Sequence, residues 1–235
     1  MTINIKILDQ NLSINSLLKD INLLKKIRTY CKRKDVIIIK ELFDEKYLNK
    51  ILRLNKNYFK SHKPFIPQSY NFSLADFYRI DKNVKKSKIK KNQTIYFYPL
   101  HKNINSEVRN FTKNISILRN KIAGLRVNYG MNNSDRHVGI GVLQHYPNNG
   151  FMSEHYDPKL PQRAVVSVIL EDDYHEGGLS LKYNNKFINI DKFISKGDVI
   201  IHAPDILHKV EKVKSSSKKA FAGRWRASSV LLPVT

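Results

Sequence analysis

The sequence predicts an α+β protein with a mainly β core, in which a closed or rolled antiparallel double sheet carries helices on its outer face. From residue 137 onward, short apolar or alternating runs are separated by turn residues, which is typical of sandwiches and barrels. Before residue 137, three segments repeat apolar residues at three- and four-residue steps, as amphipathic helices do. We therefore divide the chain into residues 1–136, an N-terminal part integral to the same fold, and residues 137–235, the strand-rich core.

The N-terminal part is predicted to combine helices with two strands. Residues 36–39 (VIII) are β-branched without polar alternation, as expected of a strand covered on both faces. The last helix can be capped by Asn105 or Ser106, and its apolar face predicts packing on the outside of the sheet. The predicted helices span residues 12–32, 44–59 and 105–125, and a second strand spans 95–100.

Residues 61–94 lack clear periodicity. They hold two prolines, scattered aromatics and the basic run 85–91, a composition that predicts a long loop over a site. This substrate loop contributes our candidate substrate contacts, namely Phe72, Asp76, Tyr78 and Arg79.

The core is predicted to be strand-rich with short turns. Glycine permits positive φ, so Gly177-Gly178 and Gly197 are expected at turns. The predicted strands span residues 138–146, 164–170, 179–183, 187–190, 198–202, 209–213 and 221–232.

A possible metal site lies at the start of this core. His155 and Asp157 are two apart, so on an extended backbone their side chains point to the same side. His208 follows a predicted strand and is the natural third ligand; His202 is the competitor, but its place inside that strand is typical of a core side chain. Two histidines and one carboxylate that leave coordination positions open are the ligand set of non-haem Fe(II) oxygenases.

The order of these motifs resembles the 2-oxoglutarate/Fe(II)-dependent dioxygenase superfamily over about residues 137–233: the His-x-Asp pair, an apolar strand, Glu-Gly-Gly at 176–178, Gly197-Asp198, His208 and a final strand with arginines. The resemblance implies a double-stranded β-helix, also called a jelly roll or cupin-like fold. It also implies Fe(II) held by His155, Asp157 and His208, a bidentate 2-oxoglutarate co-substrate, and one position for O2.

The co-substrate's distal carboxylate needs a fixed cation. Arg224, Arg226 and Ser228 share one face of a predicted strand, and Arg226-Ala227-Ser228 resembles the Arg-x-Ser pair of several branches. The spacing departs from the family, since Arg226 lies 18 residues after His208 and many members place the cation about ten after it.

Two alternatives to Arg226 remain open. Lys218 and Lys219 stand at the usual spacing, but within a hydrophilic stretch that we interpret as an elongated turn, and Arg224 is the closer rival. Tyr146 resembles a tyrosine that often hydrogen-bonds the co-substrate.

The function that the resemblance implies is hydroxylation of an unactivated C–H bond, with release of succinate and CO2; ascorbate could be needed in an assay. The expected substrate is a small molecule, such as an amino acid or a biosynthetic intermediate, or a peptidyl side chain. The alternatives are an alkylated-nucleic-acid oxidative demethylase, a non-oxygenase metal-binding cupin, and a basic binding module with a degenerate site.

Composition sets the outer bounds. The net charge of +22 is compatible with a polyanionic partner, but the excess is mostly lysine, so a solvated surface is favoured over nucleic-acid binding. The single cysteine, Cys31, excludes an intramolecular disulfide and fits a reducing compartment. No apolar run approaches the ~18 residues of a membrane span, and no signal peptide is recognised, so we expect a soluble, cytoplasmic protein.

Overall fold

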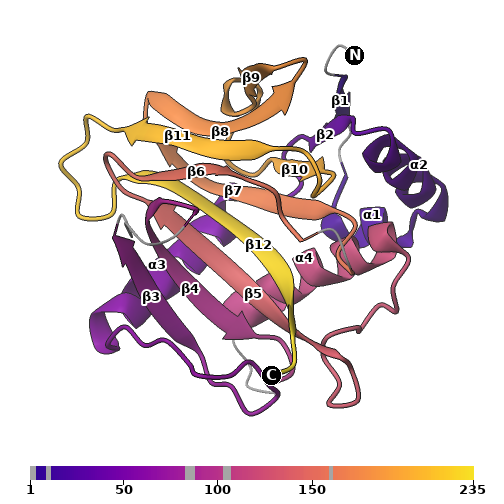
Figure 1. The fold of residues 1–235 in the computed structure, drawn as a ribbon, viewed down its shortest axis with the longest axis horizontal. Coiled ribbons are helices and arrows are strands. Elements are labelled where there is room, and N and C mark those ends of the chain that lie inside the picture. Colours follow the sequence, from indigo (N-terminus) through magenta and orange to yellow (C-terminus); the bar gives the residue numbers. More distant parts are fainter. Residues whose placement is uncertain (1–3, 9–11, 83–87, 103–106, 159–160) are drawn as a thin grey trace.

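The computed structural model describes residues 4–8, 12–82, 88–102, 107–158 and 161–235. In this part of the chain, twelve strands form one continuous hydrogen-bonded sheet with helices beside it (Figure 1). The strands are β1 (Ile5–Leu8), β2 (Val36–Ile39), β3 (Phe77–Lys82), β4 (Lys91–Pro99), β5 (His137–Tyr146), β6 (Phe151–His155), β7 (Val165–Asp173), β8 (Glu176–Tyr183), β9 (Lys186–Asn189), β10 (Val199–His202), β11 (His208–Lys214) and β12 (Gly223–Pro233). The helices are α1 (Ile14–Lys19), α2 (Ile21–Lys32), α3 (Glu45–Ser61) and α4 (Glu107–Ala123), with a 3-10 turn at Asp191–Phe193.

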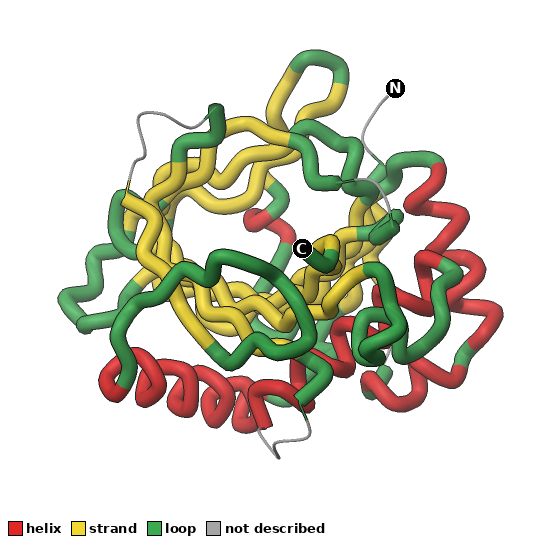
Figure 2. Tube along the Cα trace, turned by 60° about the horizontal axis from the view of Figure 1, so that its bottom comes forward, coloured by secondary structure: helices red, strands yellow, loops and turns green. Residues whose placement is uncertain are grey.

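The sheet bends at β4, which pairs with three strands, β3, β5 and β6. Its C-terminal part pairs antiparallel with β5, while its first residues pair antiparallel with β6. The strand order β1-β2-β10-β7-β12-β5-β4-β6-β11-β8-β9, with β3 attached to β4, therefore closes into the roll seen in Figure 2, with the helices along one side. This is the predicted double-stranded β-helix with helices on its outer face.

The two faces of the sheet at β2 pack into two separate hydrophobic clusters. In β2, Ile37 and Ile39 pack outward with the helices, whereas Val36 and Ile38 pack inward with the apolar lining of the roll. The strand is thus covered on both faces, as its sequence predicted, and each fully buried isoleucine contributes about 1.5–3 kcal/mol. None of the helices in the described residues is long and apolar enough to cross a membrane.

Helix α4 lies closely against β5. A Cβ atom at Gly141 would stand 2.1 Å from the Thr112 Oγ1 atom and 2.3 Å from its Cβ, so only glycine allows this approach. On the same outer face, the His145 ring stacks on Trp225 with centroids 4.3 Å apart. His145 and Trp225 thus point away from the interior of the roll, into packing.

The predicted helix over residues 12–32 is two helices. Asp20 breaks it, because its extended backbone ends α1 and its carboxylate accepts a hydrogen bond from the Leu23 N–H to cap α2. The expected cap of α4 at Asn105 or Ser106 lies outside the described residues.

The predicted loop over residues 61–94 was too long. Residues 77–82 and 91–99 are strands β3 and β4, which pair in register from Phe77 opposite Phe97 to Lys82 opposite Asn92. Aromatic side chains pair across these two strands, and the Phe77 and Phe97 rings stack with their centroids 4.4 Å apart. Pairing between strands does not show in the residue periodicity along one segment, so the sequence pattern did not reveal it.

Gly177 and Gly178 have the expected positive φ angles, 95° and 98°, but they lie inside β8 and not in a turn. Gly178 pairs with Glu211 and Glu176 pairs with Lys214, so β11 has one residue more than β8 between the two pairs and forms a β-bulge opposite Gly177. A Cβ at Gly178 would stand 2.1 Å from the Asp191 carboxylate, so only glycine at this position lets Asp191 approach the sheet so closely.

Candidate metal centre

Three potential ligands meet where β6 ends and β11 begins. His155 and His208 are directly paired across the two strands, and their ring centroids lie 4.2 Å apart. Asp157 Oδ1 lies 3.9 Å from His155 Nε2, and Asp157 Oδ2 lies 3.5 Å from His208 Nε2. One donor atom from each residue falls within 4.8 Å of the other two, so a single ion could contact all three.

A β-bulge aims His155 at this point. Met152 pairs with Val210 and His155 with His208, so β6 has one residue more than β11 between the two pairs. The extra residue turns His155 toward Asp157 and leaves Glu154 exposed. Glu154 therefore points away from the site.

Backbone carbonyls determine the tautomer of both histidines. His155 Nδ1 lies 2.8 Å from the Ser153 carbonyl oxygen, and His208 Nδ1 lies 2.9 Å from that of Ile206. A carbonyl can only accept, so each Nδ1 carries the hydrogen and each Nε2 has its lone pair free for a metal ion.

Both histidines are neutral at neutral pH. Burial lowers the pKa of His155 to about 4, and the neighbouring His208 adds to this effect. Burial also lowers the pKa of His208 to about 4, with His202 adding to it. Because metal ions bind neutral imidazole and ionised carboxylate, the residues fit a divalent ion.

His202, the sequence-level competitor, is close but not a member of this group. Its ring lies 5.4 Å from that of His208, and its Nδ1 atom lies 2.9 Å from the Ala203 carbonyl oxygen. Its Nε2 atom is buried without a hydrogen-bond partner among the described residues. Sequence periodicity predicted a core side chain, and the structure places His202 inside the roll.

Arg226 lies beside the triad. Its Nε atom donates to Gln144 Oε1 on β5, and its Nη1 atom donates to Ser167 Oγ on β7 at 3.1 Å. Its positive charge contributes to the lowered pKa values of His155 and His208, so it is electrostatically coupled to both. The side chain is only partly buried, and a ligand could reach it.

Arg224, the alternative to Arg226 as the co-substrate cation, is already paired with the carboxylate of Asp191. It is fully buried, and its Nε and Nη2 atoms donate to the Asp191 carboxylate, the second at 3.0 Å. Burial alone would lower the pKa of Arg224, but Asp191 and Tyr174 raise it. Since Asp191 also accepts a hydrogen bond from the Tyr174 hydroxyl, this cluster ties β12 to the segment after β9.

Of the other predicted co-substrate residues, Tyr146 and Ser228 lie near Arg226, whereas Lys218 and Lys219 do not lie on a strand. Tyr146 is fully buried beside both arginines, and burial raises its pKa. Ser228 is buried and pairs across the sheet with Ser167, which holds Arg226. Lys218 and Lys219 lie in the connection between β11 and β12, outside both strands, as the interpretation of an elongated turn requires.

Of the four candidate contacts from the substrate loop, one faces the interior. Arg79 lies 3.1 Å from Asp81, which is also on β3. Burial is the main cause of the lowered pKa of Lys91, and the positive charge of Arg79 is the second cause. The other three are used in packing: Asp76 pairs with Arg109, the Tyr78 hydroxyl donates to the His62 carbonyl, and Phe72 contacts His101.

Sequence reasoning missed the residues that position the arginines. Gln144 lies two residues before Tyr146, so alternation could have placed it on the same inner face. Ser167 and Asp191 could not have been found in this way, because they reach the arginines from other strands and turns, 59 and 33 residues away in sequence.

No family model matches this chain, and no curated protein matches its sequence. Solved structures do resemble it. A Pseudomonas putida prolyl-4-hydroxylase superposes with a TM-score of 0.57 at 9% identity, covering 90% of this chain and 100% of that one. The thymine-7-hydroxylase of Neurospora crassa, in complex with α-ketoglutarate and thymine, gives 0.56 at 14% identity, covering 97% and 86%.

A prolyl hydroxylase from Trichoplax adhaerens, in complex with a peptide fragment of the hypoxia-inducible factor oxygen degradation domain, gives a TM-score of 0.54 at 13% identity, covering 92% of each chain. At such identities the likeness concerns the fold. The roll is the double-stranded β-helix that 2-oxoglutarate/Fe(II) oxygenases share.

Proposed function

We propose that this chain is an Fe(II)- and 2-oxoglutarate-dependent oxygenase that hydroxylates an unactivated C–H bond of a small molecule or of a peptidyl side chain. The observation that carries the proposal is the convergence of His155, Asp157 and His208 with an available arginine on the neighbouring inner face. The structures with the same fold act on or bind both kinds of molecule, thymine in one and a peptide in another.

The candidate site residues would have separate roles in binding the metal ion and the co-substrate. His155 and His208 would bind Fe(II) through Nε2, and Asp157 through its carboxylate. Arg226 would pair with the distal carboxylate of 2-oxoglutarate, with Ser228 and the Tyr146 hydroxyl beside it. Fe(II) and 2-oxoglutarate, when bound, supply dioxygen activation coupled to decarboxylation to succinate. The apolar lining of the roll would keep competing solvent from the reacting C–H bond.

The test is succinate release by the purified protein with Fe(II), ascorbate and 2-oxoglutarate, with and without a pooled metabolite extract. We expect uncoupled turnover that the extract increases, and fractionation of the extract then leads to the substrate. Absence of succinate from protein that retains iron at the site would overturn the oxygenase and favour the cupin alternative.

Asp157→Ala provides the matching loss of function. It should abolish stoichiometric Fe(II) binding and succinate release while circular dichroism stays unchanged. Glu154→Ala, three residues away on an exposed side chain, is the control and should keep both. Iron retained at full stoichiometry in Asp157→Ala would refute the ligand assignment.

A further inference from the structure

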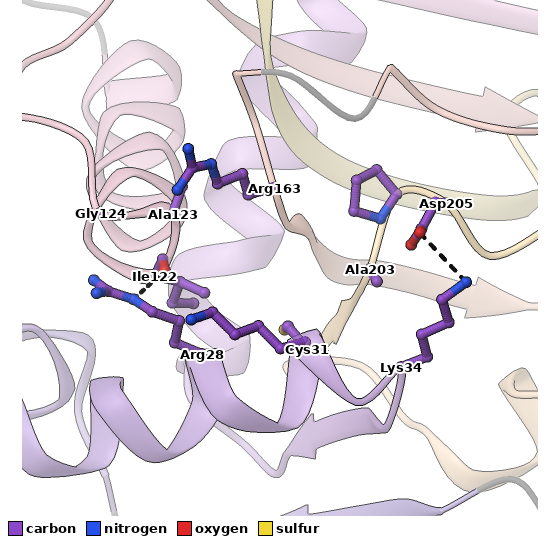
Figure 3. Close-up of a pocket in the computed structure, with 11 residues that line it drawn as sticks. Arg28, Cys31, Lys34, Ile122, Ala123, Gly124, Arg163, Ala203 and Asp205 are labelled. Atoms are coloured by element: carbon purple, nitrogen blue, oxygen red, sulfur yellow. Dashed lines mark hydrogen bonds and ion pairs between the residues drawn. The ribbon is translucent and has the colours of Figure 1, made fainter.

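A second cavity, of ≈ 540 Å³, lies between α2, the C-terminal end of α4 and two loops (Figure 3). Arg163 comes from the segment that follows Asp157, and Ala203, Pro204 and Asp205 come from the loop that leads to His208. The Asp157 N–H donates to the Pro204 carbonyl oxygen at 3.1 Å, so the cavity and the candidate metal centre share a wall. None of the three potential metal ligands lines this cavity.

The lining of the cavity is strongly cationic. It contains Arg28, Lys32, Lys34 and Arg163 against one carboxylate, that of Asp205. Asp205 lies 3.3 Å from Lys34, so its charge is already compensated. Four positive charges less one leave an excess of three in the lining.

The end of α4 accounts for only part of this excess. Arg28 donates from Nε to the Ile122 carbonyl and from Nη2 to the Lys121 carbonyl, both at 2.7 Å. A helix C-terminus is equivalent to about half a negative charge. Arg28 is therefore anchored and Lys34 is paired with Asp205, which leaves the exposed Lys32 and Arg163 as the cations available to an anionic ligand.

Arg163 is held toward the cavity by a strained turn. Its φ angle is 51°, a conformation that non-glycine residues seldom adopt, and the Ala164 N–H donates to the Gln162 carbonyl across it at 2.6 Å. Such strain persists where the surroundings require it, and often at ligand clamps. In Figure 3 the Arg163 side chain extends toward Ala123 and Gly124, two small residues that leave space.

Among the described residues, no other member of the lining supplies a compensating negative charge. Burial, followed by the nearby Asp35 carboxylate, raises the pKa of the Cys31 thiol to about 12, so the thiol is neutral. The rest of the lining is apolar or small, namely Ile122, Ala123, Gly124, Ala203 and Pro204.

We propose that this cavity binds the phosphate group of a small organic phosphate. A phosphomonoester carries a charge of about −1.5 to −2 at neutral pH, which matches the two available cations, Lys32 and Arg163, whereas a carboxylate would pair with only one of them. Guanidinium groups suit phosphate because their planar forks donate in parallel pairs. The volume lies within the ~300–1,000 Å³ typical of small-molecule pockets, which leaves room for an organic moiety against the apolar lining.

The experiment is isothermal titration calorimetry of the full chain, without added metal, using adenosine 5′-monophosphate as the probe. The pocket variant combines Lys32→Gln with Arg163→Gln, which spares the anchored Arg28. Since the whole protein is basic, a second double variant, Lys25→Gln with Lys186→Gln, removes the same charge from exposed positions outside the cavity. Melting curves establish that both variants fold.

We expect one site per chain in the parent protein, at least tenfold weaker binding in the pocket variant, and less than a twofold change in the control. Equal weakening in both variants, or no binding to the parent protein, would overturn the proposal. A DNA duplex forms the third arm. If only duplex binding responds to the pocket variant, the phosphate belongs to nucleic acid and the small-molecule site is refuted.

Discussion

Arg224 and Arg226 show how a two-residue difference in position separates two roles. Both lie on the inner face of β12, but a buried carboxylate binds Arg224, whereas neutral amide and hydroxyl groups hold Arg226. An arginine held by neutral acceptors keeps its full charge for a ligand. The co-substrate role therefore fits Arg226.

Arg226→Ala should raise the concentration of 2-oxoglutarate needed for half-maximal succinate release at least tenfold, because charge-assisted hydrogen bonds contribute about 1.5–3 kcal/mol. Arg224→Ala should instead lower the free energy of unfolding by about 3–5 kcal/mol, because it leaves the buried Asp191 carboxylate without its cation. Titrations and urea melts of both variants measure the two effects.

Lys218→Ala is the control, since Lys218 lies in the β11–β12 connection, and it should change neither quantity. A larger requirement for 2-oxoglutarate in Lys218→Ala than in Arg226→Ala would contradict the assignment. So would the reverse ranking of the two arginines.

At the scale of elements, close backbone packing positions the strands that carry the site. Helix α4 packs on β5 and β12, the strands of Tyr146 and Arg226, and Gly141 allows the helix to approach. The stack of His145 on Trp225, on the same outer face as α4, joins the same two strands. Changes at these contacts should act on stability.

Gly141→Ala should lower the free energy of unfolding by about 1–3 kcal/mol, because the new methyl group overlaps Thr112. The clash should largely disappear in a Thr112→Gly background, although the helical glycine itself costs about 1 kcal/mol. Urea denaturation of the four proteins in this double-mutant cycle gives the coupling energy. Additive effects would mean that α4 does not approach β5 as the structure shows.

His145 should make the fold sensitive to acid. Burial lowers its pKa from 6.5 to about 4, so between these pH values the unfolded chain binds more protons than the folded one. The contribution of His145 to stability is fully present above pH 6.5 and is lost as pH falls toward 4. The loss amounts to about 3 kcal/mol at 1.36 kcal/mol per pH unit.

His145→Phe keeps a ring against Trp225 and removes the titration. We expect its free energy of unfolding to fall less steeply between pH 6.5 and 4.5 than that of the parent protein. Identical slopes would show that His145 is not buried in the neutral form.

At the scale of the whole molecule, the acidic residues are largely committed to structure. Asp191, Asp198 and Asp135 are buried, and each pairs with a basic side chain. The net charge of +22 arises because 42 lysine and arginine residues outnumber 20 aspartate and glutamate residues. The excess by itself specifies no partner.

Random DNA should bind only weakly, with a Kd no tighter than the ordinary non-specific range of ~10⁻⁶–10⁻⁴ M at physiological salt. Fluorescence anisotropy with a labelled duplex, repeated across salt concentrations, measures this. Tight binding that persists at ~0.2 M salt, and improves further for alkylated DNA, would favour the nucleic-acid demethylase over the hydroxylase.

The sequence by itself determined the rolled β core, the buried strand β2, the core strands after residue 137 except β6, and the three potential metal ligands. These features follow from local periodicity and from residues that lie close together or at strand ends. Irregular aromatic pairing concealed β3, and a single capping residue, Asp20, divided a helix that periodicity made continuous.

Only the tertiary structure decided which arginine is available, how His155 is turned toward Asp157, and where a second cationic cavity lies. Each of these depends on partners that are distant in sequence: Asp191 for Arg224, the bulged pairing of β6 with β11 for His155, and the meeting of α2 with the ends of α4 and two loops for the cavity. Alternation determines the face on which a side chain lies, but only the packed chain determines what that face meets.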